Sequence, residues 1–85
     1  MASYELRIKP SAVKELEALQ AKDRRRIVRK IQNLAEEPRP PGCEKLSGQD
    51  RYRLRQGNFR VLYEVDDGRP SVTVVKIGHR RDIYR

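Results

Sequence analysis

Three strand-like runs joined by two short turns limit the possible fold most strictly. They read RYRLRQ, NFRVLYEV and SVTVVKIG, and the segments 56–58 (QGN) and 66–70 (DDGRP) join them. Apolar and polar side chains alternate along these runs, as expected for strands with one buried face. Links that are short and turn-prone connect neighbouring antiparallel strands, so this half of the chain predicts a three-stranded antiparallel meander.

The first half of the chain predicts one strand followed by two helices. Residues 4–9 alternate between apolar and polar side chains, which indicates a short, half-buried strand. Pro10 and Ser11 open a helix with Ser11 as its N-cap, and Asp23 lies near the start of a second helix. Pro38 is expected to end that second helix. Only a few residues separate the two, so they predict an antiparallel helical hairpin. The apolar stripes are Val13, Leu16 and Leu19 in the first helix and Ile27, Ile31 and Leu34 in the second.

The order of elements is therefore a strand, two helices and three strands. This order is typical of an α+β domain, with the helices on one face of an antiparallel sheet. The N-terminal strand is expected to complete a four-stranded sheet. With 85 residues and no internal repeat, the chain is expected to form a single domain over residues 1–85.

The charge of the chain favours an anionic partner. It holds 20 Lys and Arg against 12 Asp and Glu, which gives a net charge of +8 and a pI near 10.2. The single cysteine, Cys43, cannot form an internal disulfide, and Cys43 with His79 is too few for a metal site. No apolar run approaches the roughly 20 residues of a membrane span. We therefore expect a cytoplasmic protein with no metal, no small-molecule cofactor and no membrane contact.

A row of arginines is the first candidate for a functional surface. Alternate residues of a strand share a face, so Arg51, Arg53 and Arg55 are expected to stand together. Tyr52 and Leu54 then point the other way, towards the helices.

The next strand extends this row. Its apolar residues are expected to pack inward, so Arg60 shares the outer face with the arginines and Glu64 lies beyond them. A row of charges is often only a solvated face. Against that reading, like charges close together destabilise a sheet, and no acidic residue within the row offsets them. The pattern therefore favours a site for a polyanion.

The tail and the second helix add further basic residues. His79, Arg80, Arg81 and Tyr84 follow the last strand. A lone histidine and a terminal tyrosine are most often structural, and these residues join the row only if the tail lies beside it. The charges at 24–26 are expected to be exposed on the helix and to aid contact with a polyanion.

The run KLSGQDRYRLRQGNFRVLYEV and the later VTVVKIGHRRDIY resemble the RelE toxins of bacterial and archaeal type II toxin–antitoxin systems. The N-terminal YELRIKPSAVKELEAL is similar to the first strand and helix of that family, and the ending IGHRRDIYR is the most specific part. The resemblance implies a RelE-like, microbial-RNase-like fold. ParE-like toxins of the same superfamily act on DNA gyrase with the same fold, so fold alone does not decide the activity.

The resemblance also implies an activity: a ribosome-dependent mRNA interferase that cuts mRNA in the ribosomal A site without a metal. Arg60 and Arg80 are then expected to stabilise the phosphate, and Tyr84 to act as acid or base or to stack on a base. Arg53 matches a lysine of the family. Because arginine stays protonated, His79 becomes a candidate for moving a proton. The residues expected to hold the mRNA and ribosomal RNA are Arg51, Arg53, Arg55, Lys45 and Arg81.

Two further interpretations remain beside this one. One is a ParE-like toxin that inhibits gyrase by binding, without catalysis. The other is a basic nucleic-acid-binding domain that is not toxic. For a toxin, the resemblance implies a RelB-like antitoxin that covers the basic face or displaces the tail.

Overall fold

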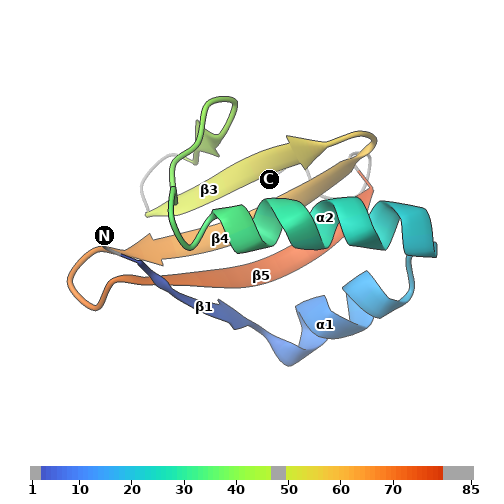
Figure 1. Ribbon diagram of the computed structural model, residues 1–85, viewed down its shortest axis with the longest axis horizontal. Coiled ribbons are helices and arrows are strands. Elements are labelled where there is room, and N and C mark those ends of the chain that lie inside the picture. Colours follow the sequence, from blue (N-terminus) through green and yellow to red (C-terminus); the bar gives the residue numbers. More distant parts are fainter. Residues whose placement is uncertain (1–2, 47–49, 80–85) are drawn as a thin grey trace.

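Two helices lie against one face of a sheet in the computed structural model, which describes residues 3–46 and 50–79 (Figure 1). The elements are β1 (Glu5–Ile8), α1 (Pro10–Glu17), α2 (Ala21–Asn33), β2 (Glu44–Lys45), β3 (Arg51–Gln56), β4 (Phe59–Asp66) and β5 (Ser71–His79). The α+β class expected from the sequence is confirmed.

The sheet has five strands in the order β1-β5-β4-β3-β2. β3, β4 and β5 form the expected antiparallel meander, and β1 lies parallel to β5 at one edge. The expected count of four strands is corrected to five, because the two-residue strand β2 pairs with β3 at the other edge. Two residues in a proline-rich loop are too few to show alternation, so no sequence pattern indicated this strand.

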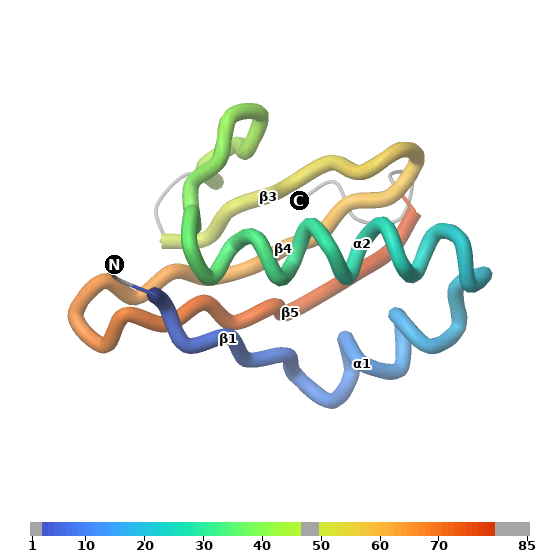
Figure 2. The backbone as a smooth tube through the Cα atoms, in the orientation of Figure 1, coloured from blue at the N-terminus to red at the C-terminus, as the bar shows by residue number. Residues whose placement is uncertain are grey.

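Both helices have bounds that differ from the sequence prediction. α1 begins at Pro10 with Lys9 as its N-cap and without a side-chain cap, so Ser11 lies inside the helix. Proline suits the first helical position, because its fixed φ matches the helix and its missing N–H would have no partner there. α2 ends at Asn33, ahead of Pro38, so the proline follows the helix end without causing it. The chain reverses between the two helices (Figure 2).

The core lies between the helices and the inner face of the sheet. Its side chains come from both helices and from β3, β4 and β5, and the predicted inward direction of Tyr52 and Leu54 is confirmed. The buried set consists of Ala12, Leu16, Ile27, Ile31, Leu34, Tyr52, Leu54, Val61, Tyr63, Val65, Val72, Val74 and Ile77. Neither of the described helices is long and apolar enough to cross a membrane.

Leu62 is a buried apolar residue on the opposite, outer face. It is only 4% exposed, although it belongs to the face that carries the arginines. Its cross-strand neighbours are Arg53 on β3 and Lys76 on β5. Long basic side chains can lie along apolar surface while their charged ends reach solvent, which accounts for this burial.

Helix α1 closes the edge of β5 beyond the end of β1. β1 pairs with β5 only as far as Val74. Further along, the Glu15 carboxylate accepts the N–H of Ile77 at 2.8 Å and lies 3.5 Å from the ammonium of Lys76. An unpaired strand edge exposes N–H groups that need partners. Glu15 supplies one, and it thereby holds the part of β5 that lies beside Arg60 on β4.

Candidate nucleic-acid interface

The sheet face that points away from the helices carries the predicted arginine row. The register opposes Arg51 to Glu64, Arg53 to Leu62 and Arg55 to Arg60. Arg60 therefore shares the outer face with the row, as the sequence predicted. The meander of short turns brings these residues together, because it aligns β3 and β4 directly.

The first two arginines of the row are paired with carboxylates. Arg51 Nη2 lies 2.6 Å from Glu64 Oε2, and Arg53 Nη2 lies 2.7 Å from Glu44 Oε1. The prediction that no acid offsets the row was therefore wrong for these two positions. Glu64 is the cross-strand partner of Arg51, and Glu44 reaches Arg53 from β2, which the sequence did not reveal. Hydrogen bonds from Arg53 lower the pKa of Glu44, and the charges of Arg60 and Arg55 lower it further.

The outer face consequently has a mixed-charge end and a cationic end. A hollow of about 480 Å³ lies at the mixed end. The charged residues that line it are Arg7, Arg51 and Arg69 together with Asp50, Glu64 and Asp66. The opposite signs balance there, so the excess positive charge of the face lies at the other end, with Arg55 and Arg60.

Arg55 and Arg60 form the cationic end. They face each other across β3 and β4, and neither makes an ion pair within the described ranges 3–46 and 50–79. Gly78 is the neighbour of Arg60 on β5, so no side chain fills the position beside it. Two guanidinium groups at one place can bind a phosphate through several charge-assisted hydrogen bonds. They can also stabilise negative charge, but as permanently protonated groups they cannot accept a proton.

His79 lies on the other side of the sheet from this pair. Its register partner is Phe59, and the two rings meet edge to face with centroids 5.8 Å apart. It shares the face of Ile77, a core residue two positions earlier on β5, whereas Arg60 and Gly78 share the outer face. The structure therefore separates the histidine ring from the guanidinium pair at the end of the sheet.

The other predicted site residues differ in position. Lys45 is exposed on β2 and is the register partner of Tyr52, so it lies on the side opposite to the arginine row. Arg80, Arg81 and Tyr84 lie outside the described residues, so their predicted roles stay predictions.

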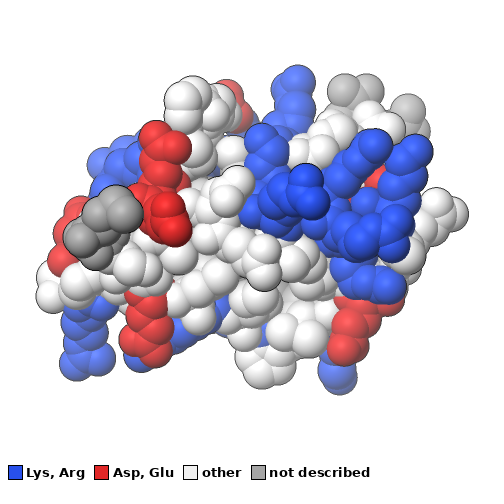
Figure 3. Space-filling view, in the orientation of Figure 1, with Lys and Arg blue, Asp and Glu red and all other residues white. Residues whose placement is uncertain are grey.

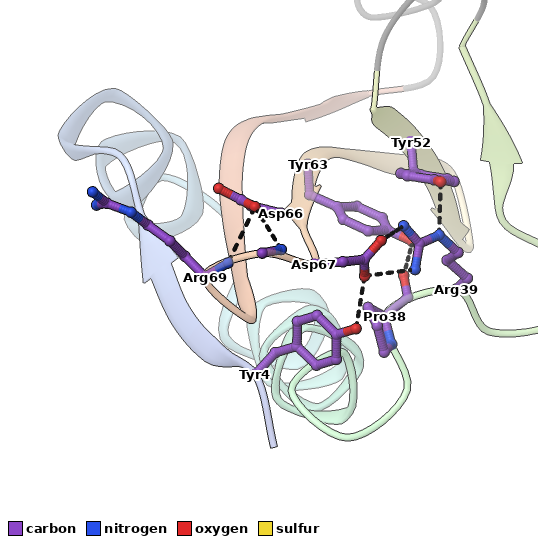
Figure 4. Close-up of polar contacts among 9 residues, drawn as sticks. Tyr4, Pro38, Arg39, Tyr52, Tyr63, Asp66, Asp67 and Arg69 are labelled. Carbon is purple, nitrogen blue, oxygen red and sulfur yellow. Dashed lines mark hydrogen bonds and ion pairs between the residues drawn. The ribbon is translucent and has the colours of Figure 1, made fainter. Parts of the chain in front are cut away.

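A polar network that the sequence did not indicate lies at the mixed-charge end (Figure 4). Arg39 reaches Asp67 through two hydrogen bonds, of 2.9 and 3.2 Å, and its Nε donates to the Tyr52 hydroxyl at 2.7 Å. Tyr4 donates to the same carboxylate at 2.7 Å. These bonds to the ionised form, from Arg39 first and then from Tyr4, lower the pKa of Asp67.

This network ties four separate segments together behind the arginine row. It joins the start of β1, the loop after α2, β3 and the turn between β4 and β5. The ring of Tyr52 stacks on Tyr63 with centroids 5.7 Å apart, and the Tyr63 hydroxyl donates to the carbonyl of Pro38 at 2.8 Å. The network therefore anchors β3 from the inner side while its arginines face outward.

A second group of basic residues lies on α2, on the helix side of the molecule (Figure 3). Its exposed members are Lys22, Arg25, Arg26, Arg29 and Lys30. The molecule thus carries cations on both of its broad faces.

Residues 6–84 match the sequence model of a protein family, the ParE toxin of the type II toxin–antitoxin system parDE. The chain belongs to this family of type II toxins. Among curated relatives, RelG of Mycobacterium tuberculosis is 41% identical over 34 residues, which are 40% of this chain and 39% of that toxin. A RelE-like toxin protein of Escherichia coli is 27% identical over 85 residues, covering 95% of this chain and 90% of its own.

Solved structures place the chain with RelE toxins in particular. The toxin–antitoxin complex RelBE2 of Mycobacterium tuberculosis superposes with a TM-score of 0.80 at 25% identity, covering 92% of this chain and 99% of the other. The isolated RelE toxin of Escherichia coli also gives a TM-score of 0.80, at 29% identity, covering 91% and 84% of the two chains. The chain is therefore a member of the RelE/ParE superfamily: its sequence matches the ParE family model, and the solved structures that resemble it are RelE toxins.

Proposed function

We propose that this type II toxin is a ribosome-dependent endoribonuclease that cuts mRNA in the ribosomal A site and so inhibits translation. The opposed pair Arg55 and Arg60 carries this proposal. These two guanidinium groups beside Gly78 have no ion-pair partner among residues 3–46 and 50–79, and they suit a phosphate of an RNA backbone. The similarity to RelE toxins supports the same reading.

The proposed reaction uses the nucleophile that RNA already contains. The 2′-oxygen forms a bond to the adjacent phosphorus as its proton passes to a base, and the bond from phosphorus to the 5′-oxygen breaks as that oxygen receives a proton. The products are a 2′,3′-cyclic phosphate and a 5′-hydroxyl. No redox step and no metal are needed. Arg60 and Arg80 stabilise the charge on the phosphorane, which is usually the largest single contribution to such catalysis.

Proton transfer in this scheme is assigned to the tail. Tyr84 is the proposed acid or base, since the arginines cannot accept a proton. His79 was the other candidate from the sequence, but its ring packs on Phe59, on the opposite side of the sheet from Arg60. Arg51, Arg53 and Arg55 hold the RNA backbone, helped by Arg81; Lys45, which shares the face of Tyr52, is left out of this set.

A protein partner is part of the proposal. RelE toxins of Escherichia coli and Pyrococcus horikoshii that share this fold were solved as complexes with RelB. A RelB-like antitoxin with acidic segments would associate rapidly with a chain of net charge +8, and more slowly at high salt.

Primer extension on translating ribosomes tests the activity. Wild-type protein should produce cuts within A-site codons, and Arg60→Ala and Tyr84→Phe should each slow cutting by about 100-fold or more. Arg69→Ala is the matched control, because this exposed arginine lies in the turn between β4 and β5. Uncut mRNA with a toxic wild-type protein, together with full toxicity of both variants, would exclude the nuclease.

Inhibition of DNA gyrase is the second candidate, and the match to the ParE family model favours it. In this case the toxin binds gyrase and catalyses nothing. Purified toxin would then block supercoiling by gyrase and leave mRNA intact on ribosomes. A supercoiling assay run beside the primer extension separates the two candidates directly.

A further inference from the structure

Strand β5 contains one extra residue where it pairs with β4. The register joins Val74 to Tyr63 and Lys76 to Leu62, so Val75 is inserted opposite the junction between Leu62 and Tyr63. An extra residue of this kind is a β-bulge, and it reverses the alternation of side chains along the strand that follows it. The second half of β5 therefore presents the opposite set of side chains to each face.

This reversal turns Lys76 to the outer face of the sheet. Val72 and Val74 are buried on the inner face, and strict alternation would place Lys76 and Gly78 beside them. After the insertion the buried residue is Ile77, at 2% exposure, whereas Lys76 is exposed. Alternation along the sequence does not reveal a bulge, so Lys76 joins a face to which the sequence did not assign it.

Lys76 adds a third cation to the end of the sheet that carries Arg55 and Arg60. Arg55, Arg60 and Gly78 form one row across β3, β4 and β5, and Lys76 precedes Gly78 by two residues on the same face. Lys76 is thus a diagonal neighbour of Arg60, at a separation of about 7 to 8 Å that long side chains can bridge. Because Gly78 has no side chain, the three cations border one position that an anion can reach.

The Lys76 ammonium is paired with a carboxylate from α1. This helix lies beside the edge of β5 (Figure 1), and Glu15 Oε2 is 3.5 Å from Lys76 Nζ. The other oxygen, Oε1, accepts the N–H of Ile77 at 2.8 Å. The two oxygens of Glu15 therefore have separate uses, since one satisfies the strand edge and the other restrains a cation.

The pair between Lys76 and Glu15 is weak. Its separation of 3.5 Å is long, because charge-assisted N–H···O bonds usually measure about 2.7 to 2.9 Å. The Lys76 side chain is 47% exposed, so water and salt screen the attraction. Arg53 differs, since it is 18% exposed and lies 2.7 Å from Glu44. Lys76 is therefore the more easily released of these two paired cations.

We propose that Lys76 is a further phosphate-binding residue of the outer face, and that RNA binding transfers its ammonium from Glu15 to the phosphate held by Arg55 and Arg60. This inference rests on the proposed function, because it names an RNA backbone as the anion. Glu15 regulates the site: its Oε2 competes with the phosphate for Lys76, while its Oε1 keeps the strand edge closed.

Binding of a single-stranded 2′-O-methyl RNA oligomer tests the role of Lys76. This oligomer keeps its phosphates but lacks the free 2′-hydroxyl, so binding is measured without cutting. In fluorescence anisotropy, Lys76→Gln should raise the Kd by about 5-fold or more and make the salt slope shallower by about 0.7, the value for one phosphate contact. Lys76→Arg keeps the charge and should bind within about 2-fold of the wild type. Lys14→Gln, exposed on α1, is the charge-matched control and should raise the Kd by less than about 2-fold.

Replacing Glu15 by glutamine tests the competition. Glutamine keeps a carbonyl oxygen for the N–H of Ile77 and loses the charge that attracts Lys76. Glu15→Gln should therefore tighten binding by about 2- to 3-fold, while hydrogen exchange of the Ile77 amide stays as slow as in the wild type. In the Lys76→Gln background this gain should disappear, because the two residues act as a pair. Glu17→Gln, exposed on α1, makes the same change in net charge and should give a smaller gain.

Three results would overturn the inference. The first is wild-type affinity of Lys76→Gln for the oligomer. The second is a gain from Glu15→Gln that Glu17→Gln equals or that survives in the Lys76→Gln background, because net charge alone would then explain it. The third is weaker binding by Glu15→Gln together with fast exchange at Ile77, because Glu15 would then act only through the strand edge.

The same measurements separate this inference from the proposed nuclease. If the wild type leaves mRNA intact on ribosomes but the variants bind the oligomer in the expected pattern, the inference stands and the nuclease fails. If the wild type cuts mRNA and Lys76→Gln binds and cuts as the wild type does, the nuclease stands and the inference fails.

Discussion

Arg55 and Arg60 lie directly opposite each other across β3 and β4, and neither has an acidic partner among residues 3–46 and 50–79. The neighbouring arginines of the row differ, since Arg51 is paired with Glu64 and Arg53 with Glu44. The fold therefore neutralises one end of the sheet face and leaves the other end charged. Such a pair reduces stability and prepares the face for an anion.

Replacing Arg55 by glutamine should stabilise the fold and weaken RNA binding at once. Removing one of two opposed cations should raise the free energy of unfolding by about 0.5 kcal/mol, because like charges directly opposite in a sheet repel. Urea unfolding measures this gain, and anisotropy with a single-stranded RNA measures the lost affinity. Arg69→Gln, in an exposed turn, should change neither quantity. A lower stability of Arg55→Gln would show that the pair is not repulsive.

Replacing Glu44 by glutamine should strengthen RNA binding. Glu44 competes with phosphate for Arg53, which it contacts at 2.7 Å. Its loss should make the salt dependence of binding to single-stranded RNA steeper by about 0.7, which corresponds to one additional phosphate contact. Glu36→Gln provides the same change in net charge at an exposed position after α2. An equal gain from both variants would indicate a general charge effect, with no particular role for Glu44.

The ion pair between Asp67 and Arg39 should make stability depend on pH on the acidic side. The pKa of Asp67 lies below its ordinary value in the folded protein, mainly through hydrogen bonds from Arg39. Its stabilising contribution is therefore complete above the unfolded pKa of about 3.9 and is lost as the pH falls through the folded value. Asp67→Asn should lower the urea midpoint clearly at about pH 7 and much less at about pH 3. Glu37→Gln, exposed after α2, should show no such difference; a constant deficit for Asp67→Asn would contradict the linkage.

The alternation of apolar and polar residues along β3 and β4 predicted which face of the sheet each side chain occupies. Alternation along RYRLRQ and NFRVLYEV predicted that Tyr52 and Leu54 face inward and that Arg60 joins the arginine row, and the structure agrees. Alternation reports only which face a residue occupies. It does not report what stands opposite, because that depends on the register between strands.

The missing information concerns contacts between distant segments. Glu44 and Arg39 come from the proline-rich loop after α2, a segment with no periodic pattern, yet they contact Arg53 and Tyr52 on β3. Short loops rich in proline can take many paths, and only the packed fold selects one. The strand pattern therefore predicted the arginine row and the face of Glu64, but it could not predict that Glu44 pairs with Arg53.

Removing the imidazole of His79 should leave the pH dependence of mRNA cutting unchanged. Its ring packs edge to face on Phe59, on the opposite side of the sheet from Arg60, so a proton from the 2′-hydroxyl has no direct route to it. Cutting rates on translating ribosomes across a pH series, for wild type and His79→Ala, measure this. Phe59→Leu is the matched control, because it alters the packing of the histidine and keeps the imidazole. If His79→Ala loses a limb of the profile that Phe59→Leu retains, proton transfer belongs to His79; an unchanged profile leaves Tyr84 as the proposed group.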